Sequence, residues 1–109
     1  MKIMVRQAAD GKVVEVEGDV DLGSSPELRS TLFSTLRDVS KLGLNLSGVR
    51  YIDSSGIATL LEVLKDSQRL NKAFVLFGLN PAVERVFRLT HVGRIFRVFS
   101  SEQEAMESA

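Results

Sequence analysis

Hydrophobic positions along the chain follow two spacings, one typical of strands and one typical of helices. Valines lie on both sides of the turn signal Asp10-Gly11, which predicts two strands, one around Val5 and one over 13–16. The next segment begins with Ser25-Pro26-Glu27, a helix-start signature with a capping hydroxyl and proline in the first turn. Leucines at spacings of four residues follow it, so we expect a helix to about Ser40.

The rest of the chain continues the alternation of strand and helix patterns. We expect a short strand over 42–46, a helix from the Asp53-Ser54-Ser55-Gly56 segment to about Leu70, a buried strand over 73–79, a helix from Asn80-Pro81 to near Gly93, a strand over 95–99 and a C-terminal helix that Ser101 and Glu104 would cap. The predicted order is β-β-α-β-α-β-α-β-α. It indicates one α/β domain over residues 1–109, with a mixed, mostly parallel sheet and helices packed on it.

Composition excludes several classes of site. The 109 residues contain no cysteine and a single histidine, His91, so disulfides, thiolate metal sites and histidine-rich metal cages are excluded. Fourteen basic residues balance fourteen acidic ones, which gives no bulk attraction to nucleic acid or to an anionic membrane. The longest apolar run, 73–79, is too short for a membrane span, and residues 1–12 lack the apolar core of a signal peptide. We therefore expect a cytoplasmic domain without membrane insertion.

One stretch near the C-terminus departs from the even charge distribution. Residues 81–98 contain four arginines and one acid, and residues 99–109 contain only acids as charged groups. A basic stretch of this kind occurs on nucleic-acid-binding surfaces, but the aromatic and glycine residues of an RNA-binding sheet do not accompany it. We interpret the arginines as solvated flanks of a helix and a strand, and we predict no nucleic-acid partner. They are Arg85, Arg88, Arg94 and Arg97.

Candidate chemistry concentrates in Asp53-Ser54-Ser55-Gly56, where a strand gives way to a helix. Helix N-termini expose unpaired N–H groups and the positive end of the helix dipole. In the simpler interpretation Asp53 or Ser54 only caps the helix, which stabilises it by about 1 kcal/mol. In the functional interpretation Ser54 accepts a phosphoryl group, which adds roughly 1.5–2 negative charges. The acids Asp19 and Asp21 lie close to it if their strand neighbours the strand before Asp53.

An enzymatic role for this segment lacks the necessary parts. The segment has no Gly-x-Ser-x-Gly elbow, and His91, the only histidine, has no recognisable acid partner. Dinucleotide-binding and P-loop fingerprints are also absent, so we predict no cofactor. Asp53 with Asp19 and Asp21 could hold a metal, but the Asp-x-Asp pattern alone is weak and no further ligand spacing accompanies it, so we interpret these acids as solvated loop charges and predict no metal. We predict a protein that is not an enzyme.

Three segments together resemble a known family. Residues 18–21 (GDVD), 44–57 (LNLSGVRYIDSSGI) and 80–87 (NPAVERVF) are similar, in order and over nearly the full chain, to a STAS domain. Within that family the chain is most similar to the stand-alone bacterial anti-sigma factor antagonists. It departs from their commonest pattern at Ala58, where glycine is frequent.

The resemblance implies a regulatory cycle. Ser54 would be the phosphorylated residue, and the partner-binding surface would include Asp21, Asp53, Ser55 and Gly56. The unphosphorylated protein, a monomer when free, would bind an anti-sigma factor serine kinase and release the sigma factor. Phosphorylation of Ser54 would end this binding, and a serine phosphatase would restore it. The alternative within the family is a constitutive interaction module, such as a subunit of a lipid-transport ABC permease or a scaffold of a stress-signalling assembly.

Overall fold

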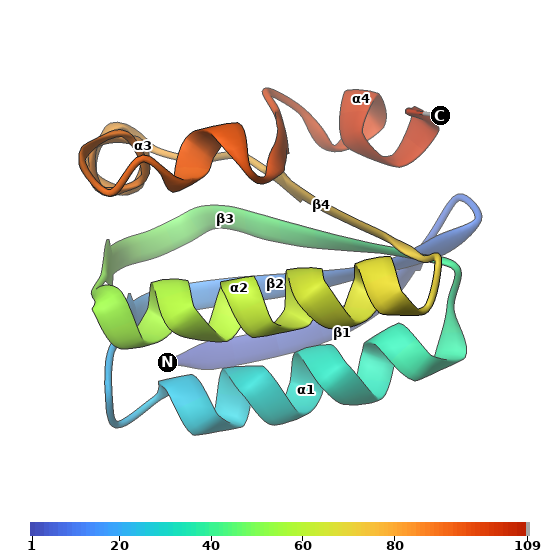
Figure 1. The fold of residues 1–109 in the computed structure, drawn as a ribbon, viewed down its shortest axis with the longest axis horizontal. Helices are drawn as coiled ribbons and strands as arrows, with labels where there is room; N and C mark the ends of the chain where they lie inside the picture. The colour runs from blue at the N-terminus through green and yellow to red at the C-terminus, as the bar shows by residue number, and fades with distance from the viewer. Residues whose placement is uncertain (109) are drawn as a thin grey trace.

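A computed structural model of the chain describes residues 1–108 and shows a five-stranded sheet in the order β1-β2-β3-β4-β5 (Figure 1). The hairpin of β1 and β2 is antiparallel, and all later neighbours are parallel. The elements are β1 (Lys2–Ala8), β2 (Gly11–Val20), α1 (Ser25–Asp38), β3 (Lys41–Ile52), α2 (Ser54–Arg69), β4 (Ala73–Phe77), α3 (Pro81–Leu89), the 3-10 turn η1 (Val92–Arg94), β5 (Arg97–Phe99) and α4 (Glu102–Glu107). This confirms the predicted fold class and element order.

Helices cover both faces of the sheet, and they cover them unequally. The main core joins the apolar faces of α1, α2 and α3 to alternate residues of the central strands, such as Val14, Leu44 and Leu76. A smaller core on the other face packs Met106 of α4 against Val13 of β2 and against Val75 and Phe77 of β4. Because successive side chains of a strand point to opposite faces, β4 is buried on both sides. None of the helices formed by residues 1–108 is long and apolar enough to cross a membrane.

Lys41, at the start of β3, fixes α4 to the sheet. This lysine is buried, and its Nζ donates to the carbonyl oxygens of Met106 at 3.1 Å and Ser108 at 2.7 Å. Burial lowers the pKa of the Lys41 ammonium, and the nearby Arg97 charge lowers it further. The C-terminal helix is therefore held at a defined place on the sheet.

Several element boundaries differ from those that the sequence pattern predicts: β2 continues to Val20, β4 ends at Phe77 and β5 begins at Arg97, and the largest differences are in β3 and α3. The third strand continues from the expected 42–46 segment to Ile52, because β2 pairs with it as far as Val20 across two register shifts. Helix α3 ends at Leu89 and does not reach Gly93. His91 takes a left-handed conformation, with φ of 60°, and breaks the helix before η1.

The expected capping hydroxyl of α1 is also absent. Ser24 occupies the N-cap position without a side-chain cap, and the Ser25 hydroxyl donates to the carbonyl oxygen of Asp21 at 2.6 Å. The proline in the first turn is present as predicted. Ser25 thus ties the start of α1 to the loop that follows β2, and this loop borders the candidate site.

Candidate functional site

The candidate site lies where β3 passes into α2 through a single residue, Asp53. The backbone N–H of Asp53 donates to Val20 of β2 at 3.1 Å, and its carbonyl oxygen accepts from Ile57 at 3.0 Å. Asp53 therefore belongs both to the end of the central strand pair β2–β3 and to the first turn of α2. This double attachment fixes the position of the residue that follows it, Ser54.

The Asp53 carboxylate caps α2. Its Oδ1 accepts from the backbone N–H groups of Ser55 at 2.9 Å and Gly56 at 3.1 Å, and from the Ser55 hydroxyl at 2.5 Å. These bonds, led by that of the Ser55 hydroxyl, hold the pKa of Asp53 below its ordinary value, although burial acts in the opposite direction. The carboxylate is ionised at neutral pH and occupies the anion-binding position of the helix N-terminus.

The loop after β2 closes over this cap. The hydroxyls of Ser25 and Ser55 lie 3.2 Å apart, which joins the first turns of α1 and α2. Each hydroxyl has a single hydrogen, and each gives it elsewhere: Ser25 to the carbonyl of Asp21, Ser55 to Asp53. The Ser25–Ser55 contact is consequently a close approach of two oxygens whose hydrogens are committed to other partners.

The predicted acids near the site have partners within the protein. Asp21 lies in this loop, as expected, and its carboxylate accepts from the backbone N–H of Ser24 at 3.0 Å. Asp19 pairs with Arg50 at 3.4 Å. Among the residues that the structure describes, no three acids or histidines form a group suited to a metal ion. The acids therefore shape the loop and the adjacent strand end.

Ser54 differs from Asp53 and Ser55, the polar residues on either side of it. It is the first residue of α2, its side chain is exposed, and its hydroxyl makes no hydrogen bond to any residue in 1–108. Gly56, two positions on, is buried, and a Cβ there would lie 2.7 Å from Ile52 Cγ1 and 2.8 Å from Val20 Cγ1. The turn thus needs glycine at 56 for packing, whereas nothing in the fold requires the hydroxyl of Ser54.

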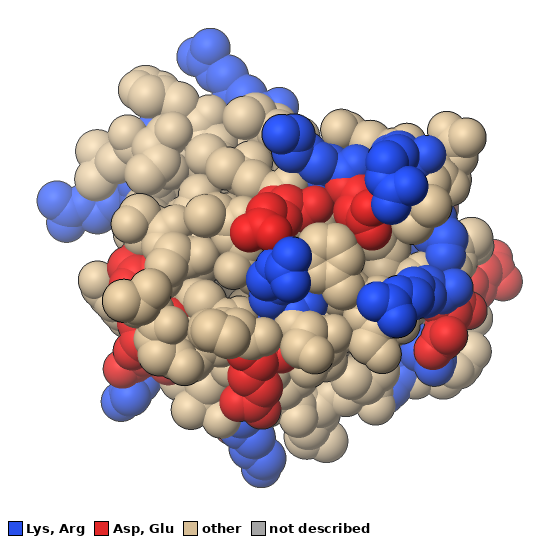
Figure 2. Space-filling model, turned by 60° about the horizontal axis from the view of Figure 1, so that its bottom comes forward, with Lys and Arg blue, Asp and Glu red and all other residues tan. Residues whose placement is uncertain are grey.

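Two large side chains close in sequence to the site residues are exposed. Leu22 in the neighbouring loop is 77% exposed and Tyr51 at the end of β3 is 53% exposed. In Figure 2 acidic and basic side chains are intermixed over the face that is drawn, and they gather most densely right of its centre. Sequence patterns did not identify Leu22, Tyr51 or the Ser25 contact, because exposure and loop packing depend on the tertiary fold.

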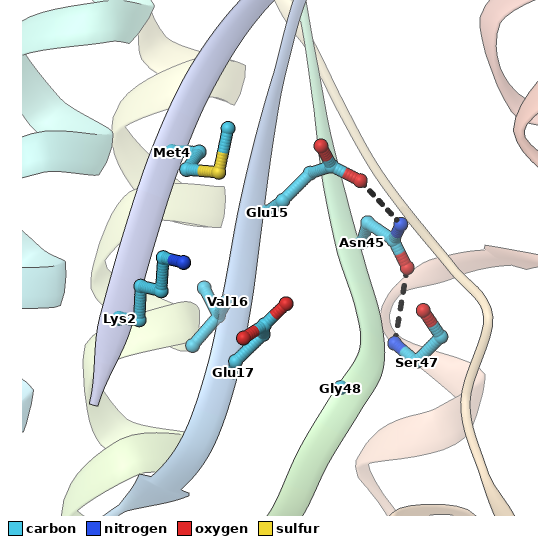
Figure 3. A pocket seen from close by; sticks show the side chains of 8 residues that line it. All are labelled: Lys2, Met4, Glu15, Val16, Glu17, Asn45, Ser47 and Gly48. Carbon is cyan, nitrogen blue, oxygen red and sulfur yellow. Dashed lines mark hydrogen bonds between the residues drawn. The ribbon is translucent and has the colours of Figure 1, made fainter.

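A small hollow on the sheet is separate from these residues (Figure 3). It lies over β1, β2 and β3 on the face away from α1 and α2, has a volume of about 100 Å³, and includes none of the predicted site residues. Three of its polar residues bind one another: the Asn45 amide donates to Glu15 at 3.1 Å and accepts from the backbone N–H of Ser47 at 3.0 Å. We assign no ligand to it.

The domain combines a mixed α/β sheet with a turn that carries two hydroxyls at the start of α2. Sequence comparison shows which domain family has this combination. The sequence profile of the STAS domain matches residues 2–105, so the chain belongs to the STAS domain family. The resemblance inferred from the three sequence segments is thereby confirmed.

Two curated relatives are named for the same regulatory role. A Thermotoga maritima protein assigned as an anti-sigma factor antagonist is 37% identical over 68 residues, or 62% of this chain and 60% of the relative. The anti-sigma-B factor antagonist of Staphylococcus aureus is 28% identical over 86 residues, which cover 78% of this chain and 80% of the relative. These relatives are named as regulatory binding proteins, not as enzymes.

Solved structures have the same fold. An anti-sigma factor antagonist from Mycobacterium paratuberculosis superimposes with a TM-score of 0.88 at 23% identity, covering 96% of this chain and 90% of that one. The Bacillus cell fate determinant SpoIIAA in its phosphorylated form superimposes with a TM-score of 0.70 at 16% identity, covering 94% and 95%. This chain has the fold of the anti-sigma factor antagonists.

Proposed function

We propose that this protein is an anti-sigma factor antagonist whose binding to its partner is switched off by phosphorylation of Ser54. In the unphosphorylated state it binds an anti-sigma factor that is also a serine kinase, and the sigma factor is released. The kinase then transfers the γ-phosphoryl group of ATP to the Ser54 hydroxyl, with loss of that proton and release of ADP. The names of the relatives and the phosphorylated form of a structural neighbour support this cycle.

The observation that carries the proposal is the contrast between two adjacent serines. The Ser55 hydroxyl is bound to Asp53 at 2.5 Å, so its use as a nucleophile would require breaking the cap of α2. The Ser54 hydroxyl is exposed and has no partner in residues 1–108, so a kinase can approach it without disturbing the fold. The partner-binding surface would include Asp21, Asp53, Ser55 and Gly56 around this hydroxyl.

The same geometry explains how a phosphoryl group would act. Asp53 already accepts the N–H groups of Ser55 and Gly56, and its negative charge would repel a phosphate on the adjacent residue. The phosphoryl group would therefore point outward, at the exposed surface to which Leu22 and Tyr51 contribute. A partner that covers this surface would have to desolvate a doubly charged group, and its affinity would fall. A serine phosphatase would restore the surface, and the cycle would operate in the cytoplasm.

The proposal is tested with purified proteins and Mg-ATP. Each candidate anti-sigma factor kinase of the organism is incubated with the wild-type protein, with Ser54→Ala and with Ser34→Ala. Ser34 is the matched control because it is an exposed helical serine on α1. We expect a gain of one phosphate, mapped to Ser54, in the wild type and in Ser34→Ala, and none in Ser54→Ala.

Binding to the same kinase is then measured without ATP. Ser54→Ala should bind like the wild type and Ser54→Asp at least about tenfold more weakly, because a buried unpaired charge costs more than 1.4 kcal/mol. Equal affinities of these two variants would contradict the switch. A protein that never acquires phosphate in its own cells, and that co-purifies with a permease or a signalling scaffold, would instead be a constitutive interaction module.

A further inference from the structure

The arginine-rich stretch near the C-terminus, which the proposed function does not use, surrounds a groove. Its walls come from α3, η1 and β5, and its volume of about 740 Å³ is within the range of small-molecule sites. The candidate site residues at the start of α2 do not line it. The groove is therefore a separate feature of the surface.

Apolar side chains form one part of the groove. Leu79, Val98 and Phe99 line it together with the inner side of Phe87, and Val98 is 40% exposed. A ligand that removes this apolar surface from water gains binding free energy in proportion to the area it covers. A wholly polar ligand would gain nothing from this part of the groove.

Basic side chains form the other part. Arg88, His91 and Arg94 line the groove, and Glu84 is the only acid that does so. Neither the guanidinium group of Arg88 nor that of Arg94 has an ion-pair or hydrogen-bond partner among residues 1–108, whereas those of Arg6, Arg29, Arg50 and Arg69 have acidic partners. The groove thus has two guanidinium groups with unused donors beside an apolar wall, and guanidinium groups bind carboxylates and phosphates in bidentate geometry.

We propose that this groove is a binding site for a soluble amphiphilic anion, a molecule with an apolar body and one carboxylate or phosphate. The apolar body would contact Val98 and Phe99, and the anionic group would accept hydrogen bonds from Arg88 and Arg94. The left-handed turn at His91 places η1 after α3 and so brings Arg94 and Arg88 to the same groove. The site does not depend on Ser54 and would be present in either phosphorylation state.

The test is an NMR titration of the ¹⁵N-labelled full chain with decanoate. We expect saturable shifts of amide signals in α3, η1 and β5, including that of Gly93, which lines the groove. Hexanoate, which has four fewer methylenes to bury, should bind at least about tenfold more weakly. Decyltrimethylammonium, with the same chain length and the opposite charge, should cause no saturable shift at these residues.

Variants test the two parts of the groove separately. The double variant Arg88→Gln/Arg94→Gln should weaken decanoate binding about fivefold, in keeping with two partly exposed ion pairs. Arg37→Gln, on an exposed arginine of α1 outside the groove, is the matched control and should bind as the wild type does. Val98→Ser should weaken binding about threefold through loss of apolar contact.

Three results would overturn the proposal. They are the absence of saturable decanoate binding, equal binding of the cationic amphiphile, and unchanged affinity in the double arginine variant. Flotation with vesicles of phosphatidylcholine and phosphatidylglycerol distinguishes a membrane as the source of the anionic group. Co-flotation without binding of free decanoate would show a lipid-surface contact and would contradict a site for a soluble ligand.

Discussion

The hydroxyl of Ser55 lies 2.5 Å from Oδ1 of Asp53, within the same helical turn that leaves Ser54 exposed. This bond assigns different properties to two neighbouring serines that look equivalent in sequence. One maintains the helix cap and the ionised state of Asp53, and the other is free for chemistry. The predictions below follow from this division and from the packing around it.

Ser55→Ala should raise the pKa of Asp53 toward its ordinary value, because it removes the hydrogen bond that contributes most to lowering it. The same change should destabilise the domain by about 1.5–3 kcal/mol, the typical effect of losing a hydrogen bond to a charged group. The measurements are a carboxyl ¹³C NMR titration of Asp53 and urea unfolding. Ser54→Ala is the matched control, and we expect it to leave both the pKa of Asp53 and the stability unchanged within about 0.5 kcal/mol.

Asp53→Asn should reduce the sensitivity of the fold to acid. The pKa of Asp53 in the folded protein lies below its ordinary value of 3.8. Its carboxylate therefore stabilises the fold above the pKa of the unfolded chain, and this stabilisation is lost as the pH falls through the folded pKa. Urea unfolding between pH 7 and pH 2 should show a smaller loss of stability on acidification in Asp53→Asn than in the wild type. Parallel curves for the two proteins would contradict the role of the Asp53 cap.

Gly56→Ala should destabilise the domain by about 1–3 kcal/mol, because the added methyl would overlap Ile52 and Val20. The control is Ala58→Gly, on the exposed side of the same helix, which introduces the glycine frequent in this family. It should cost about 1 kcal/mol or less, through helix propensity alone. Thermal unfolding of both variants tests the difference, and a Gly56→Ala variant as stable as the wild type would be inconsistent with the packing.

His91→Gly should stabilise the domain by about 0.5–1 kcal/mol, because φ of 60° is strained for a residue with a Cβ and unstrained for glycine. Asn71, with φ of 57° after α2, provides a comparison. Asparagine tolerates this conformation better than histidine, so Asn71→Gly should gain less. Chemical denaturation of the two variants measures the order, and a larger gain at residue 71 would contradict it.

Sequence patterns predicted the elements and their order because most of them depend on local spacing. The buried run of β4 and the proline-marked starts of α1 and α3 were all identifiable in this way. The length of β3 was not, because its second half pairs with β2 across register shifts that only the folded sheet defines. The end of α3 also escaped prediction, since the left-handed residue there is a histidine and not the glycine that usually marks such a position.

The sequence was sufficient to predict where the candidate site lies, but not which of its two serine hydroxyls is exposed. The Asp-Ser-Ser-Gly segment and the neighbouring Asp21 were identifiable from sequence, and the structure brings their loops together through the 3.2 Å approach of Ser25 and Ser55. Which hydroxyl is bound and which is exposed depends on the directions of side chains in the folded turn. The roles of Ser54 and its neighbours in partner binding stay predictions until the experiments above are done.

The attachment of Asp53 to both β2 and α2 has a consequence for how a signal at Ser54 would be stored. The residue next to the modified hydroxyl is held by backbone bonds to the sheet and to the helix, and we expect the turn to keep this arrangement when Ser54 is modified. Information would then reside only in the covalent mark itself. Once a phosphatase removed the mark, the domain would hold no trace of its earlier state, and each cycle would begin from the same surface.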